Sequence, residues 1–386
     1  MSAFAIKGWC PSALRPMPSG DGLIVRLRPR GGRLSSAQAG GIGELAAHHG
    51  NGWIDVTGRA NLQIRGVSDE GHEPLIAGLD RLGLIDAELR SENQRNVLVS
   101  PFWMPGDDTQ GLALGLEQAL AARRIGLPEK FGFAIDCGES RVLAQAPADI
   151  RIERSIDGDL VVRADGASRG RRVTREQAID AALSLAEWFV ASGGAKDGRG
   201  RMAAHLAVSK LPDALAGETP PGPASPSPKP GLVAAGALVG LAFGQLRCET
   251  LRYLAGVSPG LRLTPWRMVV VEALREMPQD QGLVTRADDP LLRVVACIGA
   301  PVCPEACAET RGLAAALAPH IGANTTLHVS GCTKGCAHPR AAGLTLVGTA
   351  EGLDLVRHGS ARDTPAIRGL SRAGMLADPA VVLGGC

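Results

Sequence analysis

The sequence predicts a mixed α/β protein made of two related parts, each a β-α-β unit followed by a further α/β domain. Three observations predict this fold class. A pattern of strand, helix and strand occurs twice, a proline-rich segment separates the two copies, and two cysteine pairs each follow a predicted strand in the second part. The length of 386 residues suits two or three domains, and an apolar content of 45% is sufficient for packed cores.

The first unit is expected to begin with a strand over residues 22–27 and to continue with a helix over 35–49. A second strand over 53–57 runs into residues 58–65, and more helix is expected over 73–82. These segments form the first β-α-β unit.

The second unit repeats this order. We expect a strand over residues 237–243, a helix over 248–257, a closing strand over 261–271 and more helix over 272–275. Two such units could pair into one sheet across a pseudo-twofold axis.

That pairing would place Arg59 and Arg267 on a shared surface. The two copies are out of step by one residue, because Thr57 lies two residues before Arg59 while Thr264 lies three before Arg267. The slip leaves open whether the two arginines are equivalent.

Each unit is followed by segments typical of an α/β domain. In the first part the strand candidates are 96–100, 131–135, 149–152 and 160–162, and an apolar stripe at helical spacing predicts a helix over 175–192. In the second part we expect strands over 291–296 and 326–329 with a helix over 304–320 between them.

The clearest domain boundary is residues 217–231, which carry six prolines between Pro220 and Pro230 and have no apolar periodicity. This composition predicts an extended, poorly ordered linker. The domains are therefore expected as a first β-α-β unit over 1–92, an α/β domain without a cluster over 93–216, the linker over 217–231, a second β-α-β unit over 232–283, and an α/β domain with the cysteine pairs over 284–386.

Composition limits the classes of partner. The net charge of +2 predicts no polyanionic partner, and an aromatic content of 3% disfavours base-stacking platforms for nucleic acid. The longest apolar run, 232–243, is well below the ~20 residues of a membrane span, and residues 1–7 lack the features of a signal peptide. We expect a cytoplasmic chain with no nucleic-acid or membrane partner, in which nine cysteines favour a metal or redox site over disulfides.

The two cysteine pairs are the most informative residues. Cys297 and Cys303 have the spacing C-x5-C, and Cys332 and Cys336 follow 28 residues later with the spacing C-x3-C. Zinc ribbons prefer a two-residue gap, which neither pair has. A 4Fe-4S cluster needs thiolates on loops with free backbone N–H groups, and the glycines of both segments allow such loops. The spacing favours a 4Fe-4S cluster, with structural zinc and inert buried thiols as the alternatives.

Cys303 also precedes Pro304, a favourable first residue of a helix, and a helix N-terminus favours the thiolate. Cys307 is a rival ligand, but it lies one turn into the predicted helix and is expected in the core. The remaining cysteines stand alone and are expected to be structural: Cys10, Cys137, Cys248 and Cys386.

Several of these segments resemble the nitrite and sulfite reductase family. The segments ACIGAPVCPEA (296–306) and HVSGCTKGCAHP (328–339) are similar to its cluster motif, and DVTGRANLQIRG (55–66) is similar to its repeated ferredoxin-like half-domain. Residues 95–97 and 128–131 are similar to its tetrapyrrole-binding elements. The resemblance covers nearly the whole chain outside the linker.

The resemblance implies duplicated ferredoxin-like half-domains paired into one sheet, plus two reductase-type α/β domains. It further implies that a 4Fe-4S cluster is held by the metal ligands Cys297, Cys303, Cys332 and Cys336.

Within that family, residues 7–29, the lysine of GCTKGC and the short length are most similar to a branch that acts in aerobic cobalamin biosynthesis. That branch implies a metal-free tetrapyrrole substrate, precorrin-3A, which is hydroxylated at C20 by dioxygen with formation of a γ-lactone. It also implies an NADH-linked electron donor and a mononuclear non-haem iron. The alternatives are a siroheme-dependent nitrite or sulfite reductase, in which Cys336 would bridge to the haem iron, and a non-catalytic iron–sulfur electron carrier.

A tetrapyrrole carries many carboxylates, so its pocket needs several fixed cations. By position, the residues expected to bind substrate are Arg26, Arg28, Arg59, Arg95, Lys130 and Lys334, with Arg267 as a weaker candidate because of the one-residue slip. For each arginine, and for Lys334, the alternative is a solvated surface residue. Lys334 would also raise the reduction potential of a neighbouring cluster.

One departure from the family concerns the siroheme alternative. Siroheme reductases commonly have a second lysine two residues after the position of Lys130, and this chain has Gly132 there. Among the histidines, His72, His328 and His338 are candidate iron ligands, but the sequence does not single out an iron site.

Overall fold

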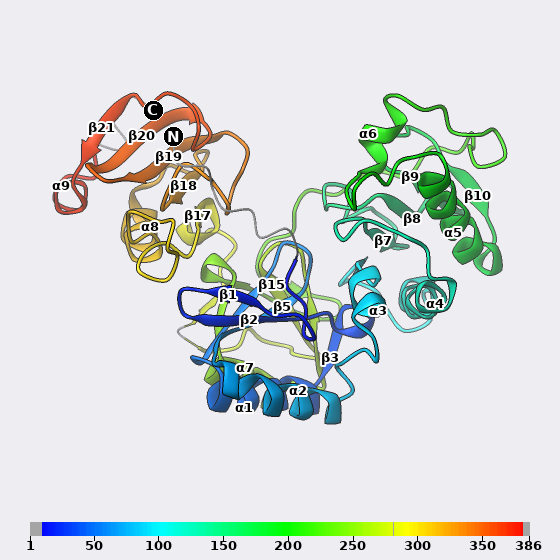
Figure 1. Cartoon of the computed structure of the whole chain (residues 1–386), viewed down its shortest axis with the longest axis horizontal. Helices are drawn as coiled ribbons and strands as arrows, with labels where there is room; N and C mark the ends of the chain where they lie inside the picture. Colours follow the sequence, from blue (N-terminus) through cyan, green and yellow to red (C-terminus); the bar gives the residue numbers. More distant parts are fainter. Residues whose placement is uncertain (1–9, 281, 381–386) are drawn as a thin grey trace.

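The computed structural model describes residues 10–280 and 282–380. A central part with two β-sheets is flanked by two lobes, one built around β6–β10 and the other around β17–β21 (Figure 1). Cys386 and the residues before Cys10 lie outside the described ranges. The fold is mixed α and β with several sheets, as predicted from the sequence.

The central part consists of two antiparallel sheets. The first has the order β1 (Met17–Ser19), β2 (Gly22–Leu27), β5 (Leu62–Val67), β4 (Trp53–Val56) and β13 (Gln245–Arg247). The second has the order β11 (Gly231–Val233), β12 (Gly236–Leu241), β15 (Met268–Glu272), β14 (Gly260–Leu263) and β3 (Arg33–Ser35), with β16 (Leu283–Val284) also paired to β12.

The two units exchange one strand each. β3 belongs to the first unit but pairs with β14 of the second, in the register that sets Leu34 opposite Leu261. In return β13 of the second unit pairs with β4 of the first, which sets Leu246 opposite Ile54. The units therefore form two sheets with reciprocal edge strands, and not the single sheet that the sequence suggested.

Helices α1 (Ser36–His49), α2 (Asp69–Arg81) and α7 (Cys248–Val257) cover one side of the central part (Figure 1). α1 begins where Ser35 and Gln38 form a reciprocal capping box, which satisfies backbone N–H groups of the first turn. α1 packs against α7 of the other unit, and buried residues of both units join one apolar core. Because the units share this core, neither buries its apolar surface alone.

Both lobes have the same topology, three parallel strands extended by two antiparallel ones. The first lobe comprises β6 (Val97–Val99), β7 (Phe133–Asp136), β8 (Ile150–Arg154), β9 (Leu160–Ala164) and β10 (Arg171–Val173), with α3 (Leu89–Gln94), α4 (Asp108–Arg123), α5 (Arg175–Ala191) and α6 (Met202–Leu206). The second comprises β17 (Val294–Ala296), β18 (Leu327–Ser330), β19 (Ala342–Thr349), β20 (Gly352–Gly359) and β21 (Ile367–Leu370), with α8 (Arg311–Leu317) and α9 (Arg372–Ala377).

Several predicted elements differ from those observed. Residues 261–271 form the β14–β15 hairpin rather than one strand, and β15 extends through Glu272, so no helix forms over 272–275. The helix predicted over 304–320 is confined to α8 and a short 3₁₀ turn, Ala318–His320. No helix among the described residues is both long and apolar enough to cross a bilayer.

The proline-rich segment is extended, as predicted, but it is bound to the first lobe. Its backbone forms isolated bridges from Thr219 to Gly170, from Pro221 to Ser155 and from Ala224 to Arg141. These hydrogen bonds replace water as partners of the segment, so the expectation of a poorly ordered linker is corrected.

The exchanged strand β3 should be a main source of stability. Leu34 is fully buried at its centre, so Leu34→Ala is expected to lower the free energy of unfolding in urea by about 2–5 kcal/mol. The matched control is Leu232→Ala on β11, where the side chain is 55% exposed and a change within about 0.5 kcal/mol is expected. Equal losses of unfolding free energy in the two variants would contradict a special contribution of β3 to stability.

Candidate functional site

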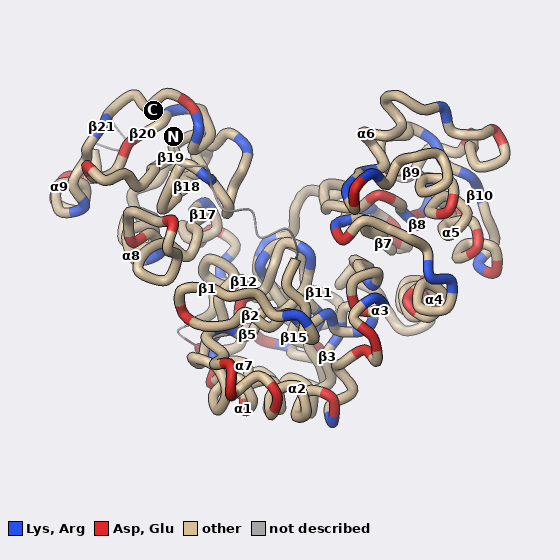
Figure 2. Tube along the Cα trace, in the orientation of Figure 1, with Lys and Arg blue, Asp and Glu red and all other residues tan. Residues whose placement is uncertain are grey.

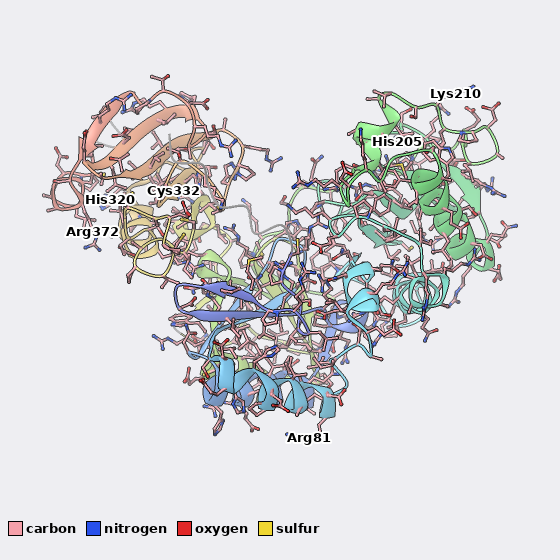
Figure 3. The ribbon with its side chains drawn as sticks, in the orientation of Figure 1. Arg81, His205, Lys210, His320, Cys332 and Arg372 are labelled. Carbon is pink, nitrogen blue, oxygen red and sulfur yellow. The ribbon has the colours of Figure 1, made fainter. Side chains whose placement is uncertain are left out.

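The four predicted ligand cysteines lie on two loops at one end of the second lobe. β17 and β18 are adjacent parallel strands, with Ala296 opposite Val329, so the loops that follow them leave the same edge of the sheet. Cys297 follows β17 and Cys332 lies just beyond β18; Figure 3 shows Cys332 in this lobe. The fold therefore brings the two cysteine segments together, as the sequence predicted.

Backbone contacts hold the two loops against each other. The Cys307 N–H donates to the Gly331 carbonyl at 2.7 Å, and the Gly331 N–H donates to the Cys297 Sγ at 3.2 Å. A Cβ atom at Gly331 would lie 2.6 Å from the Cβ of Ala306, so only glycine permits this approach.

The sulfur atoms lie in one electrostatic environment. Burial raises the pKa of the Cys332 thiol, the Lys334 backbone N–H lowers it, and the neighbouring Cys303 and Cys297 raise it. Burial also raises the pKa of Cys336, where the Lys334 charge acts in the opposite direction. Because the pKa values of these thiols are raised, they lose their protons only when positive charge lies close to the sulfurs. Bound iron would supply that charge.

The donor set suits an iron–sulfur cluster. All four predicted ligands are thiols on convergent loops, and two of them accept backbone N–H bonds, from Gly331 and from Lys334. Among the described residues, no three His, Cys, Asp or Glu side chains stand close enough to hold a single ion.

Two expectations about these loops are corrected. α8 begins only at Arg311, so Cys303 has no helix N-terminus beside it, and Cys307 is exposed instead of lying in the core. The reason is that backbone groups before α8 bond to loop partners, as the Ala300 N–H does to the Ala308 carbonyl at 2.9 Å.

The first lobe has a related sheet edge without the cysteine pairs. Ser100 directly follows β6 and donates its N–H to the Ile135 carbonyl at 2.8 Å, just as Cys297 follows β17 and donates to Val329 at 3.3 Å. Ser100 thus stands at the position of Cys297. The first lobe therefore has a hydroxyl at the position where the second lobe has the Cys297 thiol.

Two of the candidate histidines meet behind the cysteine loops. The rings of His328 and His338 lie 5.7 Å apart, whereas His72 bonds to the Ala13 carbonyl in the central part. His328 is fully buried, and neither of its ring nitrogens has a partner among the described residues. Burial, followed by the charges of His338 and Arg267, lowers the pKa of His328 to about 4, so the ring is neutral at pH 7.

Arg267 and Arg311 connect the central part to the second lobe. Arg267 donates to the Ala337 carbonyl at 3.2 Å, and Arg311 lies 3.6 Å from the Asp55 carboxylate on β4. Burial lowers the pKa of both arginines, and Asp55 opposes this effect. These contacts place positive charge between the cysteine loops and the central sheets.

Arg59 lies on the β4–β5 turn and faces the first lobe. The Thr57 Oγ1 accepts bonds from the N–H groups of Arg59 and Asn61, and Ala60 has a positive φ of 52°. The Arg59 Nη2 donates to the Lys130 carbonyl at 3.1 Å. Figure 2 shows basic segments gathered on the loops that rise from the central part between the lobes.

The corresponding turn of the second unit confirms the one-residue slip. The Thr264 Oγ1 accepts from the N–H groups of Trp266 and Met268, and Arg267 has a positive φ of 59°. By this geometry Trp266 corresponds to Arg59, and Arg267 corresponds to Ala60. The two turns lie side by side, because a Cβ atom at Gly58 would lie 3.8 Å from the Pro265 carbonyl, but Arg59 contacts the first lobe and Arg267 the second.

The other predicted cations divide into exposed and buried ones. Arg26 is half-buried, contacts Cys10, and has a lowered pKa because of burial. Lys130 is exposed, and Lys334 is half-buried between Cys332 and Cys336.

Arg28 and Arg95 are each only 5% exposed and are held in ion pairs. The distances are 3.0 Å from Arg28 to Glu92 and 2.6 Å from Arg95 to Asp86, and burial lowers the pKa of Arg28 to about 10. The expectation of a direct substrate contact does not fit these two residues, because internal carboxylates already pair with their guanidinium groups.

Sequence reasoning missed Arg201, which lies directly before α6. Its side chain is 39% exposed, bonds to Asp149 at 2.9 Å, and is near enough to Arg59 to lower the pKa of that arginine. The glycine-rich segment around Arg201 gave no motif by which it could be recognised.

Comparisons with known proteins agree with this architecture. The family described as the nitrite/sulfite reductase ferredoxin-like half domain matches residues 15–82. A precorrin-3B synthase from Sinorhizobium sp is 30% identical over 93% of this chain and 84% of that protein. A ferredoxin–nitrite reductase from Synechococcus elongatus is 26% identical over 88% of this chain and 78% of that protein.

Among solved structures, the NirA protein of Mycobacterium tuberculosis matches with a TM-score of 0.61 and 17% identity, over 88% of this chain and 75% of that one. A likeness at this identity concerns the fold alone. It supports the predicted fold class of reductase-type domains around ferredoxin-like half-domains.

The buried pair of Arg95 and Asp86 should be a structural element. Arg95→Ala leaves carboxylates buried without their partner, so we expect the free energy of unfolding to fall by about 3–5 kcal/mol. The matched control is Arg123→Ala, which removes surface ion pairs and should cost less than about 1 kcal/mol. Similar losses of unfolding free energy in both variants would show that the buried Arg95 pair stabilises the fold no more than a surface ion pair does.

Proposed function

The chain belongs to the precorrin-3B synthase family, and from this membership we propose that it hydroxylates precorrin-3A at C20 in aerobic cobalamin biosynthesis. The observation that carries the proposal is the 30% identity over 93% of the chain, which includes both half-domains and both lobes. One atom of dioxygen becomes the C20 hydroxyl, while an acetate side chain of the substrate closes the γ-lactone. The other atom leaves as water, with two electrons from an NADH-linked donor.

The proposed cluster ligands are Cys297, Cys303, Cys332 and Cys336. A bound 4Fe-4S cluster would supply electrons one at a time. The Gly331 and Lys334 N–H groups would bond to ligand sulfurs, and the Lys334 charge would stabilise the reduced state. For a mononuclear iron the described residues present no ligand set, so no residue is assigned to one.

The proposed substrate surface is formed by Arg26, Arg59 and Lys130. Arg59 and Arg26 have no carboxylate within ion-pair distance among the described residues, although Arg26 also contacts Gln63 and Cys10 and the Arg59 Nη2 donates to the Lys130 carbonyl. Charge-assisted bonds from arginine would fix the orientation of a polycarboxylate macrocycle. Lys334 is proposed to hold a carboxylate on the cluster side.

The likeness to ferredoxin–nitrite reductase supports a second candidate, a siroheme-dependent reductase. Gly132 argues against it, because it stands where siroheme reductases commonly have a second lysine, so one cationic contact to an anionic ligand is missing.

We expect anaerobically purified protein to contain iron and acid-labile sulfide but no siroheme. Its absorption spectrum should show broad iron–sulfur bands without the intense bands of a haem, and acid–acetone extraction should yield no tetrapyrrole. About one equivalent of extracted siroheme would move the function to the reductase alternative. Turnover of precorrin-3A that depends on dioxygen and a reductant would support the synthase.

Serine substitution should distinguish the cluster ligands from the neighbouring thiol. We expect Cys297→Ser, Cys303→Ser, Cys332→Ser and Cys336→Ser each to lose the cluster, because a hydroxyl is a poor iron ligand. Cys307→Ser is the matched control, since its exposed thiol lies on the same loop, and it should retain iron and sulfide. A Cys332→Ser protein with a full complement of both, or a Cys307→Ser protein without them, would refute the assignment.

A further inference from the structure

Arg201 is held in place by a buried carboxylate. Its Nε donates to the Asp149 Oδ1 at 2.9 Å, and its Nη2 lies 3.3 Å from the Ala148 carbonyl. Asp149 is 1% exposed and also accepts bonds from the Met202 N–H at 2.8 Å and the Gly132 N–H at 2.9 Å. Asp149 therefore ties Arg201 to the segment of Gly132 and fixes the direction of the arginine side chain.

The guanidinium of Arg201 keeps donors for a ligand. A guanidinium has five N–H donors, and the two described contacts use one at Nε and one at Nη2. No described residue accepts from its Nη1, and the side chain is 39% exposed. The remaining N–H groups of Arg201, including both at Nη1, are therefore available to an anionic ligand.

Arg59 approaches the same segment from the central part. Its Nη2 donates to the Lys130 carbonyl at 3.1 Å, and its Nη1 would lie 3.4 Å from a Cβ at Gly132. Arg59 thus contacts this segment directly from the central part, whereas Arg201 of the first lobe is joined to Gly132 through Asp149. Burial is the main cause of the lowered pKa of Arg59, and the charge of Arg201 is the next. Two cations joined to the same short segment, one directly and one through Asp149, favour a bound anion.

We propose that Arg201 is a substrate-binding residue, which with Arg59 clamps carboxylates of the tetrapyrrole from two sides of residues 130–132. The inference rests on the proposed function and assigns part of its substrate recognition. Asp149 is a positioning residue that orients Arg201 without touching the substrate.

Binding of uroporphyrin, a stable metal-free tetrapyrrole with eight carboxylates, tests the proposal by fluorescence titration of the holoprotein at low salt. Arg201→Gln is expected to weaken binding about 10-fold or more, as Arg59→Gln does. Arg201→Lys should recover part of the affinity, since it keeps the charge and loses the planar fork. Arg199→Gln, an exposed arginine of the same segment, is the matched control and should change binding less than twofold.

Labelling of the unmodified protein avoids any effect of the variants on folding. Phenylglyoxal modification with mass-spectrometric mapping should show that uroporphyrin protects Arg59 and Arg201 while Arg199 reacts at an unchanged rate. Equal labelling of Arg201 with and without uroporphyrin, or unchanged affinity of Arg201→Gln while Arg59→Gln is weakened, would overturn the clamp and leave the proposed function standing. Failure of the wild-type protein to bind uroporphyrin at all would overturn the tetrapyrrole site itself, and the clamp with it.

Discussion

The reciprocal exchange of edge strands in the central part is the constraint on which the rest of the structure depends. β3 completes the sheet of the second unit and β13 that of the first, so backbone pairing and one shared apolar core join segments far apart in the chain. Arg33 and Arg262 converge on Glu272 at 2.7 Å each, which adds charge pairing to this junction. Each lobe is attached to the resulting scaffold, and the positions of both lobes therefore depend on it.

The scaffold is nearly symmetric, whereas the chemistry it supports is not. The β4–β5 turn presents Arg59 to the first lobe, and the matching β14–β15 turn presents Trp266 at the corresponding position. The lobes differ in the same way, since Ser100 stands where the second lobe has Cys297. Duplication thus gives two similar halves, each a β-α-β unit with its lobe. The second half carries the candidate cluster loops, and the first carries the basic surface that is proposed to hold the substrate.

Local patterns were sufficient for most elements and for the cysteine loops. The boundaries of α7 and β2 were predicted to the residue, because apolar side chains recur at helical spacing in α7 and β2 is a short apolar run that begins at a glycine. The helix over 304–320 was predicted too long because Pro304 and the alanines after it favour helix locally. Loop-to-loop hydrogen bonds, such as that from Cys307 to Gly331, override this preference.

The sequence alone determined the duplicated architecture and the position of two cysteine segments at strand ends, because both follow from strand, helix and cysteine patterns that can be read along the chain. Only the tertiary structure decided which arginines are available to a ligand. Arg95 is enclosed by Asp86 and Glu117, while Arg201 is oriented by Asp149, which directly precedes β8 of the first lobe. A guanidinium has the same chemistry at every position, so its role depends on whether folding brings a carboxylate to it, and that partner is set by contacts between distant segments.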